Sequence, residues 1–410
     1  MSKKAGNFSR RDFIKTAGAV GIGSMLSPIE SLTHAQVGSD PKKTPLNFVP
    51  TRPFGKTGVD VSILSLGGAF HWSNLLLMKQ ALNMGITYWD TAPGYGGGQS
   101  EVGIGKYFEK FPEDREKVFL VTKADTSDPS YMTKSLNQSL ESMNTSFIDL
   151  YFLHGISSPY EADRKIKAWA DEAKSGGKIR FFGFSTHSNM EECLLGAAKL
   201  GWIDGIMFTY NFRVMHTEEM KKAVDECYRA GIGLTAMKTQ ATGWGTKRGP
   251  LSDKERALLN RFERRGLSAE QAKLKAVWDD NRIASICSYM TNMNVLKENA
   301  SAAIDNKTLS DKDKDYLKQY ARKTASHYCS GCASICESEI NNDVPISDVM
   351  RYLMYSRCYG EPGRAKSAFK EISSEVRRRM ADVDYSQVER KCPNKLPIGQ
   401  LMREAVFELV

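Results

Sequence analysis

The chain has 410 residues, 41% of them hydrophobic, which is enough for one large domain with a full core and an appendage. Its 57 Lys and Arg residues outnumber its 48 Asp and Glu residues, for a net charge of +9, but the basic residues are dispersed among acids. No Lys/Arg stripe with interleaved aromatic residues is present, which argues against nucleic-acid binding, and no interior apolar run is long enough to cross a membrane.

Residues 1–35 resemble an export signal. The segment Ser9-Arg10-Arg11-Asp12-Phe13-Ile14-Lys15 is similar to the twin-arginine pattern, a weakly apolar stretch follows it, and Thr33-His34-Ala35 suits cleavage. We therefore expect the twin-arginine translocase as a partner and a bacterial periplasmic location, with a membrane anchor if the signal is not cleaved. The alternative is a basic tail that contains an Arg-Arg pair by chance. Residues 36–50 are polar, contain Pro and predict a linker.

From residue 51 to residue 308, short β-rich runs alternate with helical segments such as Met132–Met143 and Glu218–Ala230. Strict alternation predicts parallel strands, and eight such units predict an α/β fold, a closed (β/α)8 TIM barrel. An open doubly wound sheet would instead need a Gly-rich dinucleotide fingerprint after the first strand, and residues 66–70 do not supply one. The predicted strands are Val61–Leu66, Tyr88–Ala92, Val118–Lys123, Ile148–His154, Ile179–Ser185, Ile206–Tyr210, Leu234–Lys238 and Ile286–Met290.

Four polar residues stand at or just beyond the carboxyl ends of successive predicted strands: Asp90, Tyr95, Lys123 and His154. Barrel enzymes keep their catalytic residues at this end of the barrel. Together with the segment Asp-Thr-Ala-x-x-Tyr-Gly at residues 90–96, they resemble the aldo-keto reductase family. The resemblance runs from about residue 51 to residue 303. It implies an oxidoreductase that transfers a hydride between a nicotinamide cofactor and a carbonyl or hydroxyl group.

The resemblance assigns a separate role to each residue of this group. A tyrosine has an ordinary pKa of about 10 and is a poor acid at neutral pH, but a neighbouring ammonium lowers that pKa. Tyr95 is then the general acid and Lys123 lowers its pKa. Asp90 holds Lys123 through an ion pair, and His154 orients the carbonyl oxygen. The alternative is a barrel without catalytic activity that acts as a binding or assembly module.

The resemblance also implies a site for NADP or NAD. Ser185 would contact the carboxamide of the nicotinamide, Tyr210 would stack on its ring, and Lys238 would lie near the phosphates. Glu298 and Asn299 resemble the pair that contacts the adenine in this family. The implied cofactor-binding residues are Gly68, Ser185, Tyr210, Lys238, Glu298 and Asn299.

The sequence leaves the choice of cofactor and substrate open. Val295 stands where a basic residue would hold the 2′-phosphate of NADP, so neither NADP nor NAD is favoured. We expect a small carbonyl compound or an alcohol such as a sugar, in either reaction direction, and loops around Trp72 and Trp244 would set the specificity. The charged segment 241–275 either helps to cover the cofactor or forms a solvated pair of helices.

Composition changes at about residue 309, and residues 309–410 predict a mostly helical appendage with helices at Ile346–Tyr355 and Ile398–Leu409. Three cysteines are spaced C-x2-C-x3-C, and a Cys-Pro pair follows downstream. This layout resembles the ferredoxin-like appendage of some aldo-keto reductases, which implies one [4Fe–4S] cluster with four thiolate ligands and a redox partner protein. The implied metal ligands are Cys329, Cys332, Cys336 and Cys392.

Other interpretations of these cysteines stay open. Cys358 is an alternative fourth ligand, although no Pro follows it. The same thiolates suit a tetrahedral zinc ion, with His327 as an extra ligand, and a tail without metal would hold disulfides or free thiols. A merely structural tail would leave an ordinary reductase. Cys193, Cys227 and Cys287 are predicted to be small buried core residues of the barrel.

Overall fold

The computed structural model describes residues 48–68, 74–241, 256, 260–305, 307–341 and 343–410. The predicted export signal, residues 36–47 of the predicted linker, Trp72 and Trp244 lie outside these residues. Among the described residues, no helix combines the length and the apolar character needed to cross a bilayer.

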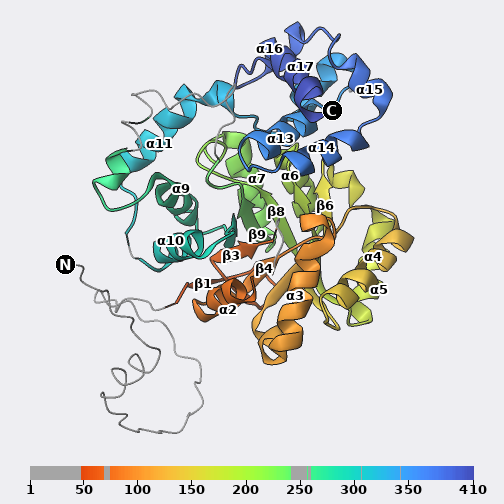
Figure 1. Cartoon of the computed structure of the whole chain (residues 1–410), viewed down its shortest axis with the longest axis vertical. Helices are drawn as coiled ribbons and strands as arrows, with labels where there is room; N and C mark the ends of the chain where they lie inside the picture. The colour runs from red at the N-terminus through yellow and green to blue at the C-terminus, as the bar shows by residue number, and fades with distance from the viewer. Residues whose placement is uncertain (1–47, 69–73, 242–255, 257–259, 306, 342) are drawn as a thin grey trace, which may run out of the picture. The chain divides into compact units, whose positions relative to one another are not determined.

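Eight parallel strands close into a barrel, which confirms the predicted fold class (Figure 1). Neighbouring strands pair in chain order, and the last strand closes the ring by pairing with the first strand and with β9. The carboxyl ends of all eight strands therefore meet at one end of the barrel. The strands are β3 (Leu64–Gly67), β4 (Tyr88–Asp90), β5 (Phe119–Ala124), β6 (Ile148–Ile156), β7 (Ile179–Thr186), β8 (Gly205–Thr209), β9 (Gly233–Met237) and β10 (Ser285–Tyr289).

The first predicted strand, Val61–Leu66, is divided between two strands. Its first part belongs to an antiparallel pair outside the barrel, and its second part is β3. The break lies where the buried hydroxyl of Ser62 donates to the carbonyl of Leu64 and accepts from the backbone N–H of Tyr88, at 2.8 Å and 3.2 Å. A side chain that bonds backbone groups in this way takes the place of ladder hydrogen bonds. The outer pair consists of β1 (Thr51–Pro53) and β2 (Asp60–Ser62).

The barrel interior is a packed core below its carboxyl end. The ring of Phe54 is fully buried there, near the amino ends of β8 and β9. A Cβ on Gly205 would meet this ring at 2.8 Å, and Gly233 faces the same ring, so glycine at both positions leaves the space that the aromatic side chain fills. Interior contacts also come from Val61, Tyr88, Phe119, Val121, Leu150, Phe152, Met207 and Ala284. The barrel interior is therefore filled by side chains and forms no pore.

Helices cover the outside of the barrel. The predicted helix Met132–Met143 is α4 (Pro129–Ser142), which begins where the carboxylate of Asp128 accepts hydrogen bonds from two backbone N–H groups. The predicted helix Glu218–Ala230 is α7 (Glu218–Arg229). The other barrel helices are α2 (Leu75–Asn83), α3 (Gln99–Lys110), α5 (Arg164–Ser175), α6 (Met190–Leu200), α9 (Ala269–Trp278) and α10 (Met293–Ile304).

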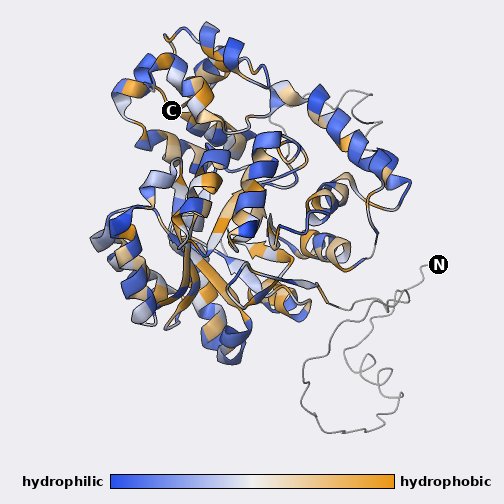
Figure 2. Ribbon diagram, turned by 180° about the vertical axis from the view of Figure 1, so that it is seen from behind, coloured by the Kyte–Doolittle hydropathy of each residue, from blue (hydrophilic) through white to orange (hydrophobic). Residues whose placement is uncertain are grey.

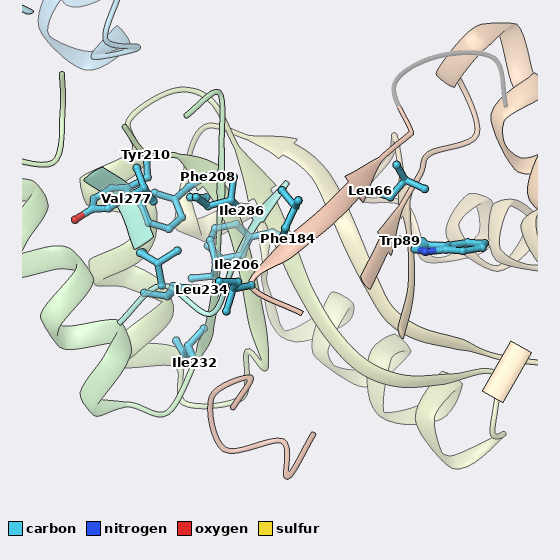
Figure 3. Packing of buried hydrophobic residues seen from close by; sticks show 14 of the residues in the cluster. Leu66, Trp89, Phe184, Ile206, Phe208, Tyr210, Ile232, Leu234, Val277 and Ile286 are labelled. Atoms are coloured by element: carbon cyan, nitrogen blue, oxygen red, sulfur yellow. The ribbon is translucent and has the colours of Figure 1, made fainter. Parts of the chain in front are cut away.

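The main hydrophobic core lies between these helices and the strands. Figure 2 shows hydrophobic colouring along the strands and hydrophilic colouring on much of the helices. Figure 3 shows part of this core, in which Ile206 and Leu234 of adjacent strands lie together. Most strand residues are apolar and buried, and the charged pair Asp90 and Lys123 lies at the carboxyl ends of two neighbouring strands.

The C-terminal helices, whose arrangement Figure 1 shows, have a hydrophobic core of their own. Met350, Phe369 and Leu401 are buried in this core. Both predicted tail helices are present, and every described regular element after residue 310 is helical. Leu317 and Tyr320 pack instead into the barrel core, so the composition change at residue 309 comes before the change of core. The tail helices are α11 (Asp311–Lys323), α12 (Ala333–Cys336), α13 (Ile346–Arg357), α14 (Pro362–Glu371), α15 (Ser374–Arg379), α16 (Ser386–Lys391) and α17 (Ile398–Leu409).

Candidate active site

Asp90 and Lys123 form a buried ion pair at the carboxyl end of the barrel. Asp90 ends β4, and Lys123 lies one residue before the end of the neighbouring strand β5. The Lys123 Nζ donates to Asp90 Oδ1 and to the carbonyl of Thr91, both at 2.6 Å, and the two residues are only 1% and 2% exposed. Burial lowers the pKa of Lys123, but the carboxylate of Asp90 raises this pKa above its ordinary value, so the ammonium is charged.

Tyr95 lies against this ion pair. It begins the short 3-10 helix η1 (Tyr95–Gly98), whose three glycines have positive φ, a conformation that glycine adopts at little cost. The centroid of its ring is 4.9 Å from the Lys123 Nζ and 5.7 Å from the centroid of the His154 ring, which it meets edge to face. The glycine turn thus brings the phenol beside the ammonium and the imidazole.

The pKa of Tyr95 differs from the prediction. Burial raises it and outweighs the opposing effect of Lys123, so the pKa of Tyr95 is raised to about 12. The ammonium limits this rise, but it does not bring the pKa below the ordinary value for tyrosine. The phenol is therefore protonated throughout the neutral range and can act as a proton donor.

His154 has a carboxylate partner that sequence analysis missed. Its Nδ1 is hydrogen-bonded to Oδ1 of Asp125, two residues after Lys123. Burial raises the pKa of Asp125, but the hydrogen bond from His154 outweighs burial and leaves this pKa below its ordinary value. For His154 burial is the larger effect, so its pKa is lowered even though the carboxylate of Asp125 raises it. An ionised carboxylate only accepts, so Nδ1 donates, and the neutral ring presents Nε2 as an acceptor. The sequence signal for this partner was an acidic residue, Asp125, just beyond the end of the predicted strand Val118–Lys123.

A cavity of 330 Å³ opens beside these residues. Asp90 and Tyr95 line it, and Met207 and Met237 give it apolar surface. A wall that combines apolar and aromatic side chains with polar groups fits a flat nicotinamide ring together with a small substrate. The tail closes the cavity with residues of α13, of α14 and of the loop between them: Tyr355, Cys358, Tyr359, Glu361 and Arg364.

Cys287 packs against the interior cluster of the barrel, in line with its prediction as a core residue, but it is only partly buried and also lines the cavity. It lies in β10, and its Sγ is 3.8 Å from Oδ2 of Asp90. The thiol is therefore located where the packed interior meets the mouth. Cys193 and Cys227 are fully buried in the main core, as predicted.

Two of the implied cofactor-binding residues lie at strand ends without lining the cavity. The buried hydroxyl of Ser185, near the end of β7, accepts from the backbone N–H of Gly155 at 2.9 Å. Gly68 follows β3 and its carbonyl accepts from the hydroxyl of Ser100 at 2.8 Å, while the preceding residue, Gly67, lines the cavity. Both residues therefore form hydrogen bonds at the carboxyl end of the barrel without contacting the cavity.

Tyr210 does not occupy the stacking position that the resemblance implied. Its ring is fully buried in the main core, 5.3 Å from the ring of Phe208 and near Val277 (Figure 3). Its hydroxyl donates to Oδ2 of Asp280 at 2.6 Å. This hydrogen bond to a carboxylate fixes the ring inside the core, away from the cavity, and Met237 lines the cavity instead.

The remaining implied residues lie on the β9–β10 side of the mouth. Lys238 lines the cavity and has a backbone φ of 56°. The buried amide of Asn299 donates at 2.9 Å to the hydroxyl of Ser288, which lines the cavity. Glu298 is exposed and accepts from the hydroxyl of Ser268 at 2.7 Å, at the start of α9. Lys238 thus lines the cavity directly, and Asn299 is connected to it through the hydrogen bond to Ser288.

The structure brings the predicted metal-ligating cysteines into one region of the tail. Cys336 and Cys392 are buried in the tail core and Cys329 packs against it. The side-chain amide of Asn394 donates to the carbonyl of Tyr328 at 2.7 Å, which ties the Cys392 loop to the Cys329 loop. Burial, and then the charges of Cys332 and Cys392, raise the pKa of Cys329 to about 12.

No disulfide joins any of the eight cysteines, all of which lie within the described residues, so the disulfide alternative is not seen. In the described part of the chain, no three His, Cys, Asp or Glu side chains are grouped as ligands of a single metal ion. The donor type still fits an iron–sulfur cluster, which is held by one thiolate on each iron, since Cys329 interacts electrostatically with Cys332 and Cys392.

The comparisons with known proteins agree on one family. The aldo/keto reductase family model matches residues 73–321, more than half of the chain. The aldo-keto reductase yakc [NADP(+)] of Schizosaccharomyces pombe is 30% identical over 149 residues, covering 33% of this chain and 42% of that protein. L-galactose dehydrogenase of Arabidopsis thaliana is 22% identical over 289 residues, covering 64% and 90%. The matches span 42% to 65% of the length of four curated relatives.

Solved structures show the same barrel. An aldo-keto reductase from Bacillus halodurans in its holo form has a TM-score of 0.54 at 20% identity, covering 66% of this chain and 96% of that chain. A thermostable aldo-keto reductase in complex with the inhibitor epalrestat has a TM-score of 0.54 at 23% identity, covering 66% and 99%. These structures support the fold, and the family model covers the strands that carry Asp90, Lys123 and His154. The chain belongs to the aldo/keto reductase family.

Proposed function

We propose that the protein is an oxidoreductase that transfers a hydride between NADP or NAD and a carbonyl or hydroxyl group of a small molecule. The observation that carries this proposal is the position of Tyr95. Its phenol lies at a cavity wall, beside the buried Lys123–Asp90 ion pair and the ring of His154. The main test is the replacement of Tyr95 by Phe, which should remove most of the turnover.

The chain's own residues handle the proton and the reacting oxygen. When bound, the nicotinamide supplies or accepts the hydride. The Tyr95 hydroxyl donates a proton to the carbonyl oxygen during reduction, and the charged Lys123 stabilises the phenolate that remains. The neutral His154 offers Nε2 as an acceptor for a substrate hydroxyl, so the same site can hold an alcohol for oxidation.

The cofactor would extend from the cavity toward the β9–β10 side of the mouth. Lys238 would hold phosphate, and Glu298 and Asn299 on α10 would contact the adenine. The name of the Schizosaccharomyces pombe relative includes NADP(+), and the Arabidopsis relative is named for a sugar, which supports NADP and a sugar-like alcohol as candidates. NAD stays a candidate because Val295 supplies no charge for a 2′-phosphate.

The tail holds one [4Fe–4S] cluster on Cys329, Cys332, Cys336 and Cys392. Such a cluster stores one electron at a time, so a redox partner protein would exchange electrons with it. The convergence of four free thiols supports this assignment.

Metal analysis of anaerobically purified protein tests the cluster. We expect about four iron atoms per chain and a broad visible absorption band, both lost in Cys392→Ser because a ligand is removed. Cys358→Ser is the matched control and should keep its iron. One zinc ion in place of iron would contradict the cluster, and iron loss in Cys358→Ser alone would move the fourth ligand to Cys358.

The twin-arginine leader directs the folded protein to the periplasm. Support comes from the Arg10-Arg11 pair and its neighbours in the sequence. The double variant Arg10→Lys/Arg11→Lys keeps the charge but removes both guanidinium groups, and cell fractionation should find it in the cytoplasm. The control Lys3→Arg/Lys4→Arg should still be exported. Normal export of the first variant would refute this route.

A further inference from the structure

The tail forms one wall of the candidate active site. Three tyrosine side chains line the cavity, and their rings follow one another in a stack: Tyr289 of β10, Tyr359 of the loop between α13 and α14, and Tyr355 of α13. The ring centroids are 6.5 Å apart for Tyr289 and Tyr359, and 6.0 Å apart for Tyr359 and Tyr355. This row joins the barrel to the tail, so the tail takes part in the selection of whatever binds there.

Arg364 of α14 is fixed in this wall by two neighbouring groups. Its Nη1 pairs with Oε2 of Glu361 at 3.0 Å, and Oε1 of Glu361 accepts from the hydroxyl of Tyr289 at 2.7 Å. The guanidinium carbon lies 4.2 Å from the ring centroid of Tyr355. A guanidinium carries five N–H donors, and only Nη1 is hydrogen-bonded to a described residue. The other donors are pre-positioned for a ligand.

Arg364 is also close to the reacting centre. Its guanidinium carbon is 5.2 Å from the ring centroid of Tyr95. A substrate whose oxygen meets the Tyr95 hydroxyl would therefore place neighbouring groups beside Arg364. The pyrophosphate of a dinucleotide is separated from its nicotinamide by a ribose, so cofactor phosphates would meet Lys238 and leave Arg364 for the substrate.

The charges around the cavity favour an anion. Lys238 and Arg364 line the cavity together with two acids, Asp90 and Glu361. Asp90 is paired with Lys123, which does not line the cavity, and Glu361 is paired with Arg364. Among the described residues, Lys238 has no carboxylate within ion-pair distance, and its Nζ lies 6.0 Å from the ring centroid of Tyr355. Burial, and then the nearby arginines of α13 and α14, lower the pKa of Lys238 well below its ordinary value. An anion bound in the cavity would oppose this lowering and favour the charged form of Lys238.

We propose that the substrate carries a carboxylate or phosphate group, which Arg364 binds beside the wall formed by Tyr355, Tyr359 and Tyr289. This inference rests on the proposed hydride transfer and names its substrate class. Glu361 is a positioning residue, because its carboxylate binds Nη1 of Arg364 and is itself held by the hydroxyl of Tyr289, which would leave the remaining donors free for the anion. A planar fork of donors matches either oxyanion in a bidentate manner.

Three sugars test this proposal: D-glucose, D-glucuronate and D-glucose 6-phosphate. They share the potential aldehyde carbon and differ in the group at one other carbon. Calorimetry measures their binding to the full chain, and turnover with NADPH and NADH is measured in parallel. We expect at least one anion to bind about tenfold or more tightly than D-glucose, and the preferred anion identifies carboxylate or phosphate. Arg364→Gln should lower that affinity by about 10- to 100-fold and change D-glucose binding by less than about threefold.

Two variants control for charge and folding. Lys370→Gln removes one charge from an exposed position on the same helix and should leave all affinities unchanged. Arg364→Lys keeps the charge without the fork and should be intermediate. Equal affinity for the three sugars, binding of neither anion, or an equal loss for anion and D-glucose in Arg364→Gln overturns the proposal. Anion preference without turnover would retain the anion site and refute hydride transfer, whereas turnover without preference would do the reverse.

Discussion

Tyr95→Phe is expected to lower turnover by about 100- to 10,000-fold, because it removes the group that exchanges a proton with the substrate oxygen. The ring and its packing against His154 remain, so the affinity for the dinucleotide should change by less than about threefold. Steady-state kinetics and equilibrium binding measure the two effects separately. Tyr131→Phe, at an exposed position on α4, is the control and should leave turnover unchanged.

The pH dependence follows from the same residue. Because burial raises the pKa of Tyr95 to about 12, the phenol keeps its proton at neutral pH. Carbonyl reduction should be nearly constant up to about pH 10 and fall as the phenol ionises at higher pH. Oxidation needs a proton acceptor and should rise over the same range. Unchanged turnover in Tyr95→Phe would contradict this role, and dinucleotide or ligand binding without any turnover in either protein would favour the binding-module alternative.

Lys123→Met should have the second large effect. The substitution leaves the carboxylate of Asp90 buried without its partner, which costs about 3–5 kcal/mol in the free energy of unfolding. It also removes the positive charge that stabilises the phenolate of Tyr95, so turnover should fall by about 100-fold or more. Urea unfolding and steady-state kinetics measure the two losses.

Two further variants separate stability from catalysis. Asp90→Asn/Lys123→Met removes both charges and should regain most of the lost stability, yet stay as inactive as Lys123→Met. Lys275 and Asp305 form an ion pair at 2.5 Å, and neither residue lines the cavity. Lys275→Met breaks this pair and should lower stability without lowering turnover of the folded protein. If the first double variant recovered activity together with stability, Lys123 would have only a structural role.

The barrel and its polar strand ends were predictable because local sequence determines them. Each strand is a short apolar run, and parallel strands bring their carboxyl ends to one place. Asp90, Lys123 and His154 therefore meet wherever those strands pair in order. The break at Ser62 was missed because a side chain bonds the backbone there, and an apolar run does not reveal such a bond.

The rest of the site depends on contacts between distant segments. The sequence shows that Tyr210 follows a strand, but Asp280 decides that its ring stays in the core. Burial decides the net pKa of Tyr95, and that burial includes a tail wall with Arg364, which no local pattern indicates. Asp125 was visible as an acid near a strand end, but only the fold joins it to His154.

Isotope transfer tests the central claim most directly. NADPH and NADH carrying deuterium at the transferable position of C4 are incubated with the protein and the sugar aldehydes named above, and mass spectrometry determines the deuterium in the alcohol product. We expect one deuterium per product molecule with the unaltered chain and at least about 100-fold slower appearance with Tyr95→Phe. Deuterium-free product, no product at all, or equal rates in the two proteins would contradict a hydride-transfer site built on Tyr95.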